Sequence, residues 1–147
     1  MKPVHLDIKK KKYDDSASDK DRKDILSRVW MHNENIIYYM EVVIISPFTI
    51  DLMFGKVLEL AKKTKPCGLL LDLRNCDVPD AETRRAINEQ FSEICELVDH
   101  CAFVSGKNII INTAVKFVMF QTDLKSFSIN KTQDEGVNKI NEVINEK

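Results

Sequence analysis

The amino-acid sequence predicts one α/β domain built on a mixed, mainly parallel five-stranded sheet. Short runs of β-branched and aromatic residues alternate with longer segments in which apolar residues recur every three or four positions. One run, residues 68–74, is apolar at nearly every position, which is typical of a central parallel strand buried on both faces. With 147 residues and 44% hydrophobic content, the chain can form one core, and we expect no second domain.

The first 24 residues differ in composition from the rest of the chain. They hold almost no apolar side chains after Ile8, and a basic run at residues 9–12 is nearly cancelled by aspartates. Such a segment buries too little surface to offset its ordering entropy, so we expect residues 1–24 to be a mobile leader and residues 25–147 to be the folded domain. Residues 4–8 alternate apolar and polar side chains, which alternatively favours a short edge strand.

The domain is predicted to begin with a β-hairpin. Residues 25–31 and 36–45 are rich in β-branched and aromatic side chains, and both Asn33 and Asn35 in the connection accept left-handed backbone angles. Pro47 ends the second strand because proline cannot donate a hydrogen bond to a sheet. This hairpin would add one antiparallel strand to the sheet.

Two helices are predicted, one before and one after the strand at residues 68–74 along the chain. From Thr49, apolar side chains recur on one helical face until Pro66 interrupts the pattern. The residues of that face are Ile50, Met53, Phe54, Val57, Leu58 and Ala61. Pro79 and Asp80 introduce the second helix, which has acidic side chains in its first turn, near the positive pole of the helix.

The last third of the chain continues the alternation of strands and helices. Residues 101–104 form a short apolar run, and residues 107–120 are apolar on most sides, which predicts a helix that is mostly buried or meets a partner, although its first residues also favour a strand. Residues 127–129 predict the last strand, and Thr132 and Glu135 form a capping box that opens the final helix. The predicted order is therefore ββαβαβαβα, with four helices.

Several of these segments together resemble the SpoIIAA-like proteins of the STAS superfamily (sulfate transporter and anti-sigma-factor antagonist). The segments that carry the resemblance are the hairpin with Asn35, "LLLDLRN" at 69–75, "AETRRAINEQF" at 81–91, "AFVSG" at 102–106 and "FVMFQTDLKSFSI" at 117–129. The resemblance implies a five-stranded sheet with four helices, and regulation through contact with another protein instead of catalysis.

One position departs from the pattern of this family. The best understood relatives carry a phosphorylatable serine or threonine just before the second helix. Here residues 75–82 contain no hydroxyl side chain, and the nearest, Thr83, is predicted to lie inside the helix. The sequence therefore does not predict a phosphorylation switch or an anti-sigma partner.

Polar residues follow several of the predicted strands and form the candidate ligand site. Ligands of open α/β sheets collect at the carboxyl ends of the strands. The candidates are Ser46, Asp72, Arg74, Asn75, Ser105 and Lys107. Arg74 and Lys107 would face an anion there, helped by free amides at the start of the third helix. Alternatively, Asp72 and Arg74 lie on the same side of a strand and pair with each other, or Asp72 accepts hydrogen bonds from loop amides, in a purely structural role.

Composition excludes several functional classes. A net charge of −1 gives no electrostatic basis for binding nucleic acid. Four cysteines without Cys-x-x-Cys spacing, and only four glycines, predict neither a metal site nor a cofactor cradle. The chain shows no signal peptide and no run of about 18 apolar residues, so we expect a cytoplasmic protein without membrane insertion.

Two functions stay open at this point. Because no nucleophile and base stand in a recognisable motif, we expect no enzyme. The first hypothesis is a regulatory or protein-interaction domain that contacts another protein or a second copy of itself through the apolar third helix, including Ile110, Phe117 and Phe120. The alternative is a carrier for a small anionic or lipid-like ligand.

Overall fold

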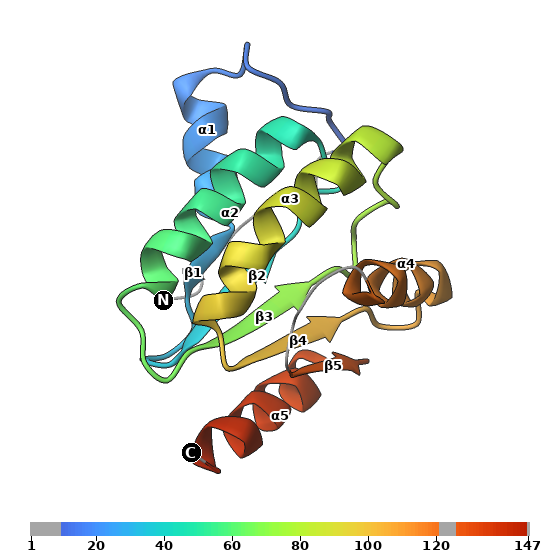
Figure 1. The fold of residues 1–147 in the computed structure, drawn as a ribbon. Coiled ribbons are helices and arrows are strands. Elements are labelled where there is room, and N and C mark those ends of the chain that lie inside the picture. The colour runs from blue at the N-terminus through green and yellow to red at the C-terminus, as the bar shows by residue number, and fades with distance from the viewer. Residues whose placement is uncertain (1–9, 121–125, 147) are drawn as a thin grey trace.

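A computed structural model of the chain describes residues 10–120 and 126–146 (Figure 1). These residues form an α/β protein with five strands in one mixed sheet and five helices. In chain order the elements are α1 (Asp19–Leu26), β1 (Val29–Met31), β2 (Ile36–Met40), α2 (Pro47–Ala61), β3 (Gly68–Asp72), α3 (Ala81–Leu97), β4 (His100–Val104), α4 (Ile109–Phe120), β5 (Phe127–Asn130) and α5 (Gln133–Asn145).

The sheet confirms the predicted hairpin and the mainly parallel arrangement. Strand β1 pairs with β2 in the antiparallel direction, and β2, β3, β4 and β5 are parallel. The strands lie side by side in chain order, β1-β2-β3-β4-β5. Tyr38 is opposite Leu70, which is opposite Ala102, so the centres of three strands share one register.

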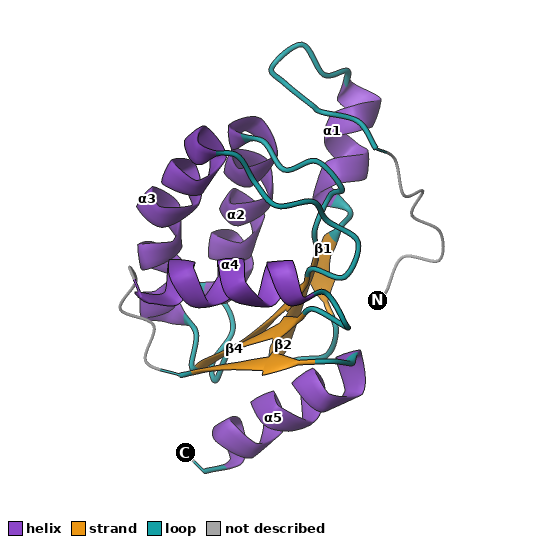
Figure 2. Cartoon of the chain, turned by 90° about the vertical axis from the view of Figure 1, so that its right-hand side faces the viewer, coloured by secondary structure: helices purple, strands orange, loops and turns teal. Residues whose placement is uncertain are grey.

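The helices cover the two faces of the sheet unequally. Helices α2 and α3 lie together on one face, α5 lies on the opposite face, and α4 lies near the carboxyl ends of β3 and β4 (Figures 1 and 2). The larger core, on the α2 and α3 side, includes Ile50, Phe91 and Leu71. A smaller core under α5 is formed around Leu70 and Ile140.

Helix α1 corrects the prediction for the start of the chain. Residues 19–24 were expected in a mobile leader and residues 25–31 in a strand, but a helix occupies Asp19–Leu26 and the strand begins at Val29. The helix count is therefore five within the described residues, and not four. Residues 1–9, including the alternative edge strand at 4–8, lie outside the described residues.

The physical reason for this error is that α1 has no apolar stripe. Ile25 is its buried residue. The helix is held by local and tertiary contacts instead: the Ser18 hydroxyl accepts a hydrogen bond from the Asp21 amide, and the Arg22 guanidinium lies 4.9 Å from the centre of the Phe48 ring of α2. These contacts need the fold, so a periodic pattern in the sequence does not report them.

The second strand is shorter than predicted. It ends at Met40, whereas the apolar run continues to residue 45. The Glu41 amide still donates a hydrogen bond to the Asp72 carbonyl, at 3.1 Å, and beyond it the chain leaves the sheet to reach Ser46, the N-cap of α2. Residues 41–45 therefore connect β2 to α2 instead of extending the strand.

Candidate functional site

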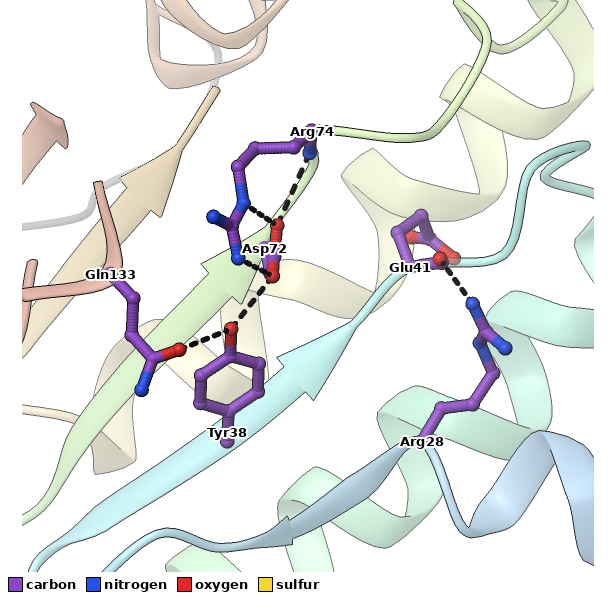
Figure 3. A network of polar contacts seen from close by, with 6 residues as sticks. All are labelled: Arg28, Tyr38, Glu41, Asp72, Arg74 and Gln133. Atoms are coloured by element: carbon purple, nitrogen blue, oxygen red, sulfur yellow. Dashed lines mark hydrogen bonds and ion pairs between the residues drawn. The ribbon is translucent and has the colours of Figure 1, made fainter. Parts of the chain in front are cut away.

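At the end of β3, two of the predicted site residues, Asp72 and Arg74, form an ion pair. Arg74 donates hydrogen bonds from Nε to Asp72 Oδ1 at 2.9 Å and from Nη2 to Asp72 Oδ2 at 2.7 Å (Figure 3). The Tyr38 hydroxyl donates to Asp72 Oδ2 at 2.7 Å, and Gln133 Oε1 of α5 lies 3.3 Å from the same hydroxyl. The carboxylate is therefore hydrogen-bonded on both oxygens, by Tyr38 of β2 and by Arg74 just beyond the end of β3.

Electrostatics favour the ionised form of Asp72. Burial acts to raise the pKa of this carboxyl, but hydrogen bonds from Arg74 and Tyr38 together hold the pKa below its ordinary value. The same contact with Asp72, stronger than the effect of burial, raises the pKa of Arg74. Because the charge of Arg74 is balanced inside the protein, the structural interpretation of the Asp72–Arg74 pair explains the geometry without an anion.

The other predicted site residues are dispersed. Ser46 is buried as the N-cap of α2, and its hydroxyl donates to the Tyr13 carbonyl at 2.8 Å. Ser105 is buried, and its hydroxyl hydrogen-bonds the Asn112 side chain of α4. Asn75 and Lys107 are exposed. The structure brings only Asp72 and Arg74 into direct contact.

Of the residues predicted for an interaction surface, Ile110 is described and is 67% exposed. The side chains of Phe117 and Phe120 lie outside what the structure describes.

The strand order explains why these residues form no common ligand site. Open α/β sheets bind ligands where the strand order reverses, because the helices on the two sides of that point diverge. In this sheet the order β1-β2-β3-β4-β5 never reverses, so no such crevice opens between neighbouring strand ends. A hollow forms elsewhere, on the face covered by α2 and α3.

This hollow is an apolar cavity of about 80 Å³ between the sheet, α2, α3 and α4. Its lining residues are Ile50 and Phe54 of α2, Leu71, Leu73 and Phe103 from β3 and β4, Ile87 and Phe91 of α3, Ile111, Ala114, Val115, Val118 and Met119 of α4, and Glu41, Ile45, Cys76 and Pro79 from the connections. A single water needs only about 10–15 Å³ by this measure, and a dry cavity of about 150 Å³ holds benzene. At about half the volume of that benzene site, the cavity has room for a short chain or for a small ring that it encloses only in part.

Glu41 is the acidic group on the cavity wall, and it is 5% exposed. Its carboxylate accepts hydrogen bonds from the Tyr39 hydroxyl at 2.9 Å and from the Val42 amide at 2.9 Å. Arg28 lies nearby but donates to backbone carbonyls. Its Nε donates to the Met40 carbonyl at 3.1 Å. Its Nη2 donates to the Glu41 carbonyl at 3.0 Å (Figure 3). Among the described residues, the carboxylate accepts no hydrogen bond from a cation.

Burial therefore dominates the protonation of Glu41. It raises the pKa of this carboxyl from 4.5 to about 7, against the opposing effects of the Val42 amide, the Tyr39 hydroxyl and Arg28. Near neutral pH the side chain is present in both charged and neutral forms. A buried carboxyl with a shifted pKa in an apolar hollow is the pattern that marks a candidate site.

Cys76 also lines the cavity, in surroundings that disfavour its reactive thiolate form. Its thiol donates to the Leu73 carbonyl at 3.4 Å, and burial raises the pKa of the thiol well above its ordinary value. A thiol that stays protonated is inert toward most electrophiles. The described residues contain no group of three histidine, cysteine, aspartate or glutamate side chains placed to hold a metal ion.

Sequence reasoning missed Glu41 as a site residue. The run at residues 36–45 was interpreted as a continuous strand, within which a single acid has no special meaning. The available signal was that Glu41 is the one charged residue in that apolar run, since a charge so placed must be paired, neutralised or functional.

Comparisons of the chain with protein-family models, with curated proteins and with solved structures give no match. Among the described residues, no helix combines the length and the apolar character that crossing a membrane requires.

Proposed function

We propose that this protein is a non-enzymatic binding module that holds a small, largely apolar molecule in the cavity beneath α4. The observation that carries this proposal is the cavity itself, about 80 Å³ of space whose wall is apolar except for Glu41 and Cys76. Water gains few hydrogen bonds in such a space, whereas an apolar ligand loses its exposed surface there.

The size of the cavity limits the affinity. Burying a CH₂ group contributes about 0.8 kcal/mol, so a ligand of five or six carbons gains roughly 4–5 kcal/mol before the costs of association. Without those costs, this gain would correspond to a dissociation constant on the order of 1 mM, which is therefore the tightest binding expected of a minimal fragment. A natural ligand that extends beyond the cavity would bind more tightly.

The test is a titration of the protein with small rings, namely cyclopentanone, methylenecyclopentane and benzene, followed by NMR. Binding should shift the signals of cavity residues such as Phe91 and Val115, and should saturate. Ala114→Leu adds three carbons on the cavity wall and should weaken binding at least tenfold. Thr113→Leu places the same side chain at an exposed position of α4 and should leave binding unchanged. Saturable shifts that persist in Ala114→Leu, or no shifts with any ring, would refute the proposal.

A second candidate function is protein interaction through α4, as in the STAS-like resemblance. What favours it is the exposure of two large apolar side chains at the start of α4, Ile109 at 76% and Ile110 at 67%. The observed five-stranded sheet is compatible with the sheet that the resemblance implies. The four cysteines are free thiols, which supports a reducing compartment such as the cytoplasm.

Sedimentation velocity of the wild type and of Ile110→Asp separates this second candidate from the first. Self-association that the aspartate abolishes would support an interface between two copies. If the wild type is a monomer, and Ile110→Asp binds the rings as the wild type does, the cavity remains the functional site.

A further inference from the structure

We infer that Glu41 is the polar anchor of the cavity, and that its neutral form donates a hydrogen bond to an uncharged acceptor, such as a carbonyl, on the ligand. This inference rests on the proposed binding function and adds to it the class of ligand and a dependence on pH. The ligand would be a compact apolar molecule with one acceptor oxygen, bound in preference to its hydrocarbon analogue.

The direction of the hydrogen bonds at Glu41 supports a donor role. Tyr39 donates to one carboxyl oxygen and the Val42 amide donates to the other. When Glu41 is neutral, its O–H and the Tyr39 O–H bring two protons to a single contact, and the Val42 amide can accept neither, so one of these two donors has no acceptor within this group. Glu41 is a lining residue of a hollow whose other lining groups are apolar, apart from the Cys76 thiol. A ligand acceptor would supply the missing partner.

The charged and titratable groups around Glu41 do not supply a cation for an anionic ligand. Arg28, which precedes β1, directs its hydrogen bonds to the Met40 and Glu41 carbonyls. The other titratable groups facing it are the Tyr39 hydroxyl of β2 and the Cys76 thiol, which already donates to the Leu73 carbonyl. The described side chains that helices α2, α3 and α4 contribute to the cavity are all apolar. The geometry thus favours an uncharged ligand over the anionic ligand considered from the sequence.

The protonation of Glu41 then controls binding. Burial raises the pKa of Glu41 to about 7, so the donor is largely present below neutrality and is lost above it. When the side chain ionises, its lone pairs face the ligand oxygen and repel it. Affinity for an acceptor ligand should therefore fall by up to tenfold per pH unit above pH 7, and binding near neutrality should be accompanied by proton uptake.

The experiment compares cyclopentanone with methylenecyclopentane, which has a CH₂ group in place of the carbonyl oxygen and nearly the same shape. Each ring is titrated by NMR at about pH 5.5 and about pH 8.5. We expect cyclopentanone to bind at least tenfold more tightly at the lower pH, and methylenecyclopentane to change by less than twofold. In Glu41→Gln, which keeps an N–H donor at both pH values, the pH dependence of cyclopentanone binding should disappear.

The outcomes separate the inference from the function on which it rests. If both rings bind equally and independently of pH, or cyclopentanone binds better at the higher pH, the anchor role of Glu41 is refuted and the cavity remains a binding site. If neither ring binds at either pH, the proposed function fails, and the inference fails with it. Because the pair of rings tests the wild-type protein, the result does not depend on how well Glu41→Gln folds.

Discussion

The two faces of the sheet each bury a carboxyl group beside the end of a strand, and they treat it in opposite ways. Asp72 faces α5 and Glu41 faces the cavity, and each accepts a hydrogen bond from a tyrosine of β2, Tyr38 or Tyr39. These tyrosines are adjacent, so they point to opposite faces of the sheet. What differs is the cation: Arg74 reaches the Asp72 carboxylate with two hydrogen bonds, and the pKa of Asp72 falls below its ordinary value.

Glu41 shows what burial does in the absence of such a pair. Its neighbouring cation, Arg28, is directed to backbone carbonyls, and burial raises the pKa of Glu41 to about 7. The comparison teaches that the hydrogen bonds of the guanidinium, more than its proximity, decide whether a buried carboxyl stays charged. We interpret the first carboxyl as structural and the second as available for function.

Packing also differs between the two faces of the sheet: it is closer under α5 than beside α4. Under α5, a Cβ placed on Gly68 would lie 2.2 Å from Ile140 Cγ2, and one placed on Gly136 would lie 3.2 Å from Leu70 Cδ1. Helix α5 thus approaches the sheet as closely as glycine permits. On the other face, α4 leaves a cavity of about 80 Å³.

The largest effect is expected from Asp72→Asn, which removes the charge that Arg74 binds. We expect a loss of about 3 kcal/mol in the free energy of unfolding at pH 7, since hydrogen bonds between charged groups are worth about 1.5–3 kcal/mol each and Arg74 is partly exposed. Urea denaturation measures this loss. Because the pKa of Asp72 is lowered in the fold, the stability that it contributes is present above 3.8 and is lost as pH falls through the folded value. A loss below about 1 kcal/mol would contradict the structural role of this pair.

Glu41→Gln should show the opposite dependence on pH. The pKa of this carboxyl rises from 4.5 to about 7 on folding, so the native state becomes progressively less stable as the pH rises between these two values. Above about pH 7 the contribution of Glu41 to stability no longer changes with pH. The unfolding free energy of the variant relative to wild type should therefore increase by about 3 kcal/mol between pH 4.5 and pH 8. Urea denaturation at both pH values checks this. A difference that does not change with pH would show that Glu41 ionises normally.

A smaller effect is expected from Gly68→Ala, which tests the close packing of α5. The added methyl group must displace Ile140, at a cost of about 1–2 kcal/mol. Gly55→Ala is the matched control, because a Cβ at Gly55 meets no atom within 4 Å. That change lies inside α2 and should stabilise the protein by about 0.5–1 kcal/mol through helix propensity. Equal effects of the two substitutions in thermal unfolding would contradict the difference in packing.

The sequence predicted those features that depend on local patterns. The structure confirms a strand within the apolar run at 68–74, the helix whose stripe begins near Thr49, and the final helix with Thr132 as its N-cap. The predicted return contact of the capping box differs, because the Glu135 carboxylate accepts from the Lys131 amide instead of the Thr132 amide. The pairing of Asp72 with Arg74 was one of the interpretations that the sequence offered, because two-residue alternation places both side chains on one side of a strand.

Local sequence patterns did not predict the cavity or the role of Glu41. The wall joins residues as distant in sequence as Glu41 and Met119, and their meeting depends on how α4 is seated against the strand ends. Helix α1 was missed for a related reason, since it is held by contacts with α2 instead of by an apolar stripe of its own. Tertiary placement decides both features, and spacing along the chain does not report it.

The consecutive strand order also has a consequence for assembly. Every strand pairs with a strand that is next to it along the chain, so no segment must wait for a distant one before it joins the sheet. The hairpin can form first, and each strand synthesised later finds its neighbour already in position. Leaving the ribosome from its N-terminus, the chain could build its sheet in the order of translation, with α5 closing the second face last.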